Sequence, residues 1–119
     1  MKLSHAAIVV PAVVLGFAAC GGERLPPKAL VDAKTEYAQA KNGIAIQLDP
    51  TDVHEADLAL QKAVQAWNDE PDEPNTLDLA VIAQRKAQIA EAEAATMKSQ
   101  QETDAAKREI QAAIAGQLQ

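Results

Sequence analysis

The chain has 119 residues, which suit one domain, and its 11 Lys and Arg against 17 Asp and Glu give a net charge of -6. This acidic balance excludes the basic footprint of a nucleic-acid-binding protein, and a single cysteine excludes an intrachain disulfide or a cysteine-based zinc cluster. Alanine dominates the composition, whereas Phe, Trp and Tyr occur once each, so β-sandwiches and barrels are disfavoured. The composition predicts an all-α protein.

Residues 1–19 have the features of a secretory signal peptide. Lys2 gives the start a positive charge, and residues 6–19 are uncharged and rich in aliphatic side chains. This run is shorter than the roughly 20 residues that a helix needs to cross a bilayer. We therefore expect a segment that is removed on export.

The end of this segment resembles a bacterial lipobox, because Ala18 and Ala19 lead into Cys20 and Gly21 follows. It departs from the usual pattern at Phe17, where an aliphatic residue is common. The resemblance implies that Cys20 is lipidated and becomes the mature N-terminus, and that the protein reaches the outer membrane. Two or three acyl chains would anchor it stably, at about 0.8 kcal/mol per buried methylene. Ordinary cleavage after Cys20, or no processing, are the alternatives.

Residues 20–27 form a short tether whose glycines and paired prolines oppose regular structure. A stripe of apolar residues at spacings of three and four follows: Leu30, Ala33, Tyr37, Ala40 and Ile44. This periodicity predicts a helix over about 28–48. We expect it to be weakened at Gly43 rather than ended, since an interior glycine costs about 1 kcal/mol relative to alanine.

A second helix is predicted over 50–68. Asp49 can cap it, Pro50 suits its first position, and Asp52 lies in its first turn. Its apolar stripe again has spacings of three and four: Val53, Ala56, Leu60, Ala63 and Trp67. Two prolines and four acids then form a loop that turns the chain back.

A third helix is predicted over about 76–116, because no proline or glycine interrupts that stretch. Asn75 or Thr76 can cap it. Its first part has a heptad seam of small residues that ends in a methionine: Ala80, Ala83, Ala87, Ala90, Ala94 and Met97. Exposed pairs at i, i+4 are expected further on, from Lys98 to Glu102 and from Asp104 to Arg108.

These elements predict a three-helix antiparallel bundle, in which a short helical hairpin packs on a long, coiled-coil-like third helix. The whole of 28–119 then forms one alanine-rich helical domain. Two short helices cover only about half of the third, so residues from about Ser99 onward need a partner or stay exposed. Self-association, contact with another envelope protein and a marginal solvated helix are all open.

Two stretches carry a family resemblance. One runs Asp52-Val53-His54-Glu55-Ala56 and continues to Ala63, and the other runs Asp78-Leu79-Ala80-Val81-Ile82 and continues to Ala92. Together they resemble the alanine-rich domain-of-unknown-function 4398 family of bacterial envelope lipoproteins, over about residues 27–95. The resemblance implies a helical domain in the cell envelope. It implies no catalytic or ligand residues, and the OmpA-like domain that often follows in the family is not found before Gln119.

Few side chains suggest chemistry. His54 fits a solvated first-turn residue better than a metal ligand or general base, because a pocket of partners is not evident. Trp67 with Tyr37 fits a core stripe better than a ligand groove, and Arg85-Lys86 fits a solvated face. No phosphate loop, nucleophile elbow or metal-ligand spacing occurs. We therefore expect no enzyme, cofactor or metal site.

Two functions remain. The first is a lipid-anchored envelope lipoprotein, facing the periplasm from the outer membrane, that acts as a non-catalytic scaffold through its third helix. The second is a periplasmic binding module that uses the helical groove around Trp67 for a small apolar ligand or peptide. In both cases Cys20 would attach the protein to the membrane through its acyl chains, and nucleic acid is not a partner.

Overall fold

The computed structural model describes Gly22 and residues 24–119 of the chain. In this part the chain forms four helices and no strands: α1 (Lys28–Asn42), α2 (Ala45–Leu48), α3 (Pro50–Asp69) and α4 (Pro74–Gln117). The predicted all-α class is confirmed. The fold is elongated because α4, with 44 residues, is about 66 Å long at 1.5 Å per residue.

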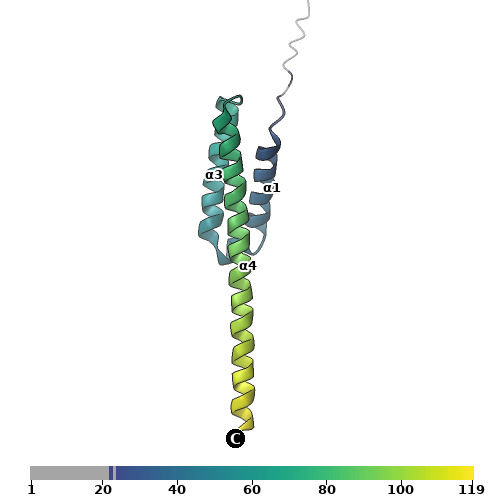
Figure 1. Cartoon of the computed structure of the whole chain (residues 1–119), viewed down its shortest axis with the longest axis vertical. Coiled ribbons are helices and arrows are strands. Elements are labelled where there is room, and N and C mark those ends of the chain that lie inside the picture. Colours follow the sequence, from purple (N-terminus) through teal and green to yellow (C-terminus); the bar gives the residue numbers. More distant parts are fainter. Residues whose placement is uncertain (1–21, 23) are drawn as a thin grey trace, which may run out of the picture.

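The three longer helices lie side by side along the first half of α4, as Figure 1 shows. In this view α1 and α4 run in the same direction, and α3 runs in the opposite direction. The short α2 connects α1 to α3 and contacts all three longer helices. The second half of α4 continues alone beyond this packed region (Figure 1).

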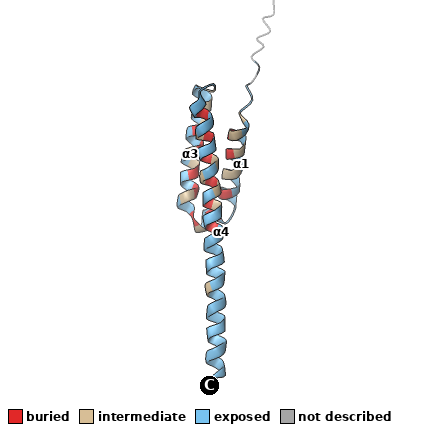
Figure 2. Ribbon diagram, viewed as in Figure 1, coloured by how far each residue is buried: buried red, intermediate tan, exposed pale blue. Residues whose placement is uncertain are grey.

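A seam of alanines on α4 forms one side of the core. The predicted heptad seam is confirmed for five members, Ala80, Ala83, Ala87, Ala90 and Ala94, which are buried. It is wrong for Met97, which is 40% exposed because the other helices end before it. The other helices contribute mostly small or medium residues, namely Leu30, Ala33 and Ala40 from α1 and Val53, Ala56, Leu60 and Ala63 from α3. Methyl side chains let the helix backbones approach closely. Close contact between helices along the seam therefore takes the place of packing between bulky side chains. Figure 2 shows this buried seam in red and the exposed second half of α4 in blue.

The single helix predicted over 28–48 is wrong, because α1 ends before Gly43 and α2 is a separate turn. The Gly43 backbone is extended, with φ -94° and ψ -161°, while its N–H still donates to the Gln39 carbonyl at 2.8 Å. A Cβ at this position would lie only 2.9 Å from that carbonyl oxygen. The change of direction leaves Ile44 39% exposed, and Ala45 is buried in its place.

The predicted start of α3 is confirmed. Asp49 precedes the helix, and its carboxylate accepts a hydrogen bond from the Asp52 backbone N–H at 3.3 Å. Pro50 occupies the first turn, where its missing N–H costs no helical hydrogen bond. The cap therefore fixes where the chain turns from α2 into α3.

The predicted caps of α4, Asn75 or Thr76, are wrong. The helix begins at Pro74 after Glu73, and no side-chain hydrogen bond caps it. Thr76 has another role, since it is buried and its hydroxyl donates to the Glu70 carbonyl at 2.8 Å. This bond joins the first turn of α4 to the end of α3 across the loop.

The exposed pairs on the second half of α4 agree only in part with the prediction. Lys98 lies 3.8 Å from Glu102, as expected. Asp104 lies 3.9 Å from Lys107 rather than pairing with Arg108. Pairs of this exposed kind contribute little to stability because water and salt screen them.

Candidate functional site

The predicted lipid-attachment residue, Cys20, and the predicted signal peptide over 1–19 lie outside the residues that the structure describes. Their roles stay predictions. Across Gly22 and residues 24–119, none of the helices is apolar over a long enough stretch to span a membrane.

Trp67 and Tyr37 belong to the packing of the helices. Both are partly buried, and both pack against a core cluster that includes Leu30 and Leu60. This position is consistent with their interpretation as core residues. Whether Trp67 also binds a ligand stays a prediction.

The other polar candidates lie on the surface. His54 is exposed, and Arg85 donates to the side chain of Gln88 at 2.9 Å. Lys86 forms an ion pair with Glu55 at 2.8 Å, which links α4 to α3. Hydrogen bonding and charge attraction within this pair lower the pKa of Glu55 and raise the pKa of Lys86. The pair is thus an exposed ion pair between two helices, with a structural role.

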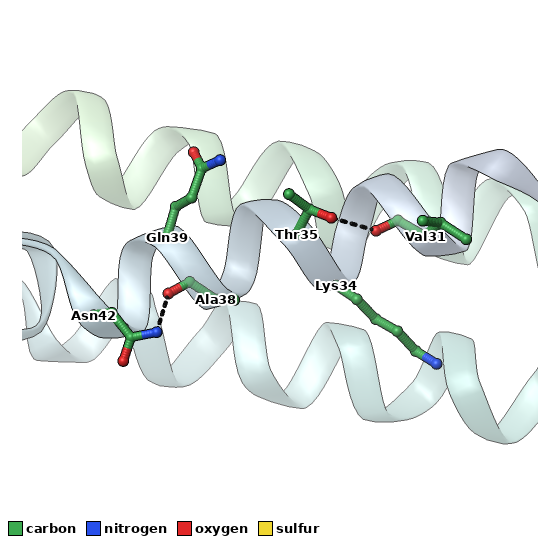
Figure 3. A pocket seen from close by; sticks show the side chains of 6 residues that line it. All are labelled: Val31, Lys34, Thr35, Ala38, Gln39 and Asn42. Carbon is green, nitrogen blue, oxygen red and sulfur yellow. Dashed lines mark hydrogen bonds between the residues drawn. The ribbon is translucent and has the colours of Figure 1, made fainter.

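A shallow hollow lies on α1 alone (Figure 3). Its polar groups bond within the same helix: the Thr35 hydroxyl donates to the Val31 carbonyl at 3.0 Å, and the Asn42 amide donates to the Ala38 carbonyl at 2.8 Å. A ligand there would meet one helix and few free polar groups, so this hollow is a poor binding site.

A second hollow lies between α3 and α4. Its apolar floor includes Leu58 and Ile82, which are 45% and 49% exposed, and Lys62 and Lys86 border it. Lys86 is already paired with Glu55. The hollow therefore has a mixed apolar and cationic lining but no converging set of free polar groups.

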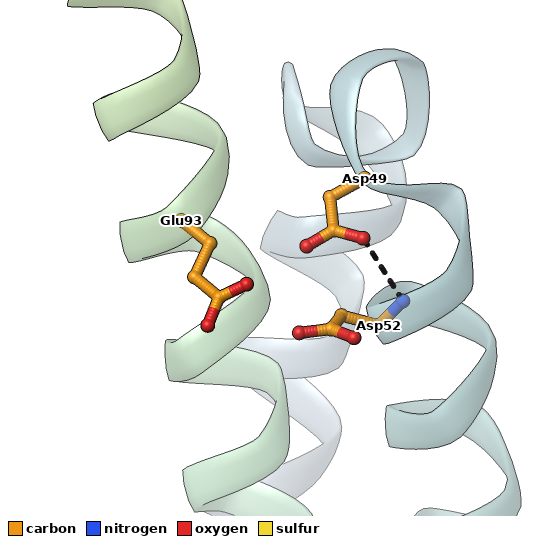
Figure 4. A group of neighbouring side chains, drawn as sticks. All are labelled: Asp49, Asp52 and Glu93. Carbon is orange, nitrogen blue, oxygen red and sulfur yellow. Dashed lines mark hydrogen bonds between the residues drawn. The ribbon is translucent and has the colours of Figure 1, made fainter.

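Three carboxylates converge where α2, α3 and α4 meet. The side-chain oxygens of Asp49, Asp52 and Glu93 lie within 4.8 Å of one another, as Figure 4 shows. The negative charge of Asp52, with smaller effects of burial and of Asp49, raises the pKa of Glu93. Calcium sites use six to eight oxygen ligands, and Asp49 already accepts a bond from the Asp52 backbone. The three carboxylates are thus too few to form a metal site by themselves, and they are a point of charge repulsion.

Sequence reasoning missed this cluster. Glu93 is far from Asp49 and Asp52 in the chain, and only the packing of α4 against α3 brings them together. The spacing of the three acids matches no metal-binding motif, so no local signal could have found them.

The second half of α4 has no packing partner among the residues that the structure describes (Figure 1). No described residue after Ala94 is buried. Several aliphatic side chains are exposed there: Met97 at 40%, Ile110 at 60%, Ile114 at 53% and Leu118 at 85%. Within the described residues this half of α4 packs against no other helix, so its apolar side chains form an exposed surface.

Comparison with known proteins gives one match. No curated protein and no solved structure is significantly similar to the chain. A protein family described as a domain of unknown function, DUF4398, matches residues 28–114. The match continues past Ala95, where the predicted resemblance ended, and includes most of the uncovered half of α4. The chain therefore belongs to the DUF4398 family.

Proposed function

We propose that the protein is a lipid-anchored bacterial envelope lipoprotein that acts as a non-catalytic scaffold. In this proposal the acyl chains on Cys20 hold it in the outer membrane, facing the periplasm. Residues 20–27 serve as a tether, and a three-helix antiparallel bundle presents α4. The exposed half of α4 then joins the anchor to another envelope component or to a second copy.

One observation carries this proposal: α4 continues as a regular helix to Gln117, although its internal partners end near Ala94. Most helical stability in proteins comes from packing of an apolar face, and the uncovered half of α4 has no such packing within the described residues. The family match extends to Ile114, which supports treating the uncovered half as part of the domain. A contact surface would account for the exposed apolar residues there.

The anchor is tested by the mass of the mature N-terminus and by membrane fractionation, with Cys20→Ser as the matched variant. We expect the wild-type chain to carry two or three acyl groups on Cys20 and to fractionate with the outer membrane. The Cys20→Ser chain should lose both properties. An unmodified wild-type chain would refute the anchor.

The scaffold is tested by crosslinking in cells. A photoreactive phenylalanine analogue in place of Ile110 should trap one dominant protein product. The same analogue in place of Lys34, which is exposed on α1, is the control and should not trap it. If neither position gives a defined product, the scaffold proposal fails.

A further inference from the structure

We draw no further inference here: the strongest candidate, the exposed face of the second half of α4 that carries Ile110 and Ile114, is an unpartnered surface, and nothing in the described part of the structure shows what covers it.

Discussion

Replacing Ala90 with Leu tests whether the alanine seam sets the spacing of the helices. Ala90 is completely buried and packs with Ala40 of α1 and Val53 of α3, which are 0% and 2% exposed. The substitution adds three carbon atoms at a point where helices meet from two sides. Because none of these neighbours borders solvent, the larger side chain can fit only if the helices separate or the leucine takes a strained rotamer.

The size of the effect follows from two opposing terms. Burial of three more carbons would stabilise the fold by about 0.8 kcal/mol per CH₂ if space were available. Strain in a well-packed core outweighs that gain, and such small-to-large changes cost about 1–3 kcal/mol net. In a domain of this size each kcal/mol lowers the melting temperature by about 4–8 °C. We therefore expect Ala90→Leu to melt about 4–24 °C below the wild type.

The assay is thermal and urea unfolding followed by circular dichroism, with Ala112→Leu as the matched control. Ala112 lies on the same side of α4 but is exposed. Its replacement by Leu should change the free energy of unfolding by no more than about 0.5 kcal/mol. If Ala90→Leu unfolds at the wild-type midpoint, the seam is not closely packed and the reasoning is refuted. Equal losses in both variants would point to helix propensity rather than packing.

Three further changes test single interactions. Asp49→Ala should lower the free energy of unfolding by about 1 kcal/mol through loss of the cap, whereas Asp49→Asn should keep most of it, as urea midpoints will show. Thr76→Val should cost about 0.5–1.5 kcal/mol by removing the hydroxyl bond to the Glu70 carbonyl, which keeps its bond from the Glu73 N–H, and Thr76→Ser should cost less; a larger loss in Thr76→Ser would assign the effect to the buried methyl group. Repulsion from Asp52 raises the pKa of Glu93 above 4.5 in the folded chain, so the folded state holds the proton of Glu93 more tightly than the unfolded state does. As the pH rises and Glu93 ionises, the repulsion therefore destabilises the folded state. The melting temperature of Glu93→Gln should therefore rise relative to that of the wild type as the pH is raised from acidic to neutral. A difference between the two melting temperatures that does not change with pH would contradict this.

The sequence predicted the helices well because their periodicity is local. Apolar residues at spacings of three and four marked the buried faces of α1, α3 and α4, and all five seam alanines are buried. The break at Gly43 was missed for a different reason. The cost of an interior glycine is small, so propensity alone favoured a continuous helix, whereas the chain must turn there for α3 to pack against α4.

The same distinction applies to the candidate sites. The uncovered half of α4 was predictable, since it follows from comparing helix lengths. The clustering of Glu93 with Asp49 and Asp52 was not, because it depends on the register of α4 against α3. Local pattern therefore predicted which faces pack, and only the three-dimensional register determined which charges meet.

Amide hydrogen exchange along α4 tests whether the uncovered half is held by its own sequence or by a partner. Around Ala83 and Ala90 the helix is buried, so those amides should exchange only when the packed region opens. Beyond Ser99 no described residue is buried, and in dilute monomer these amides should exchange faster, from the far end inward. If a second copy binds this half, raising the concentration should slow exchange there. Equal, concentration-independent protection along all of α4 would show that helix propensity alone maintains it, and its exposed isoleucines would then need another explanation.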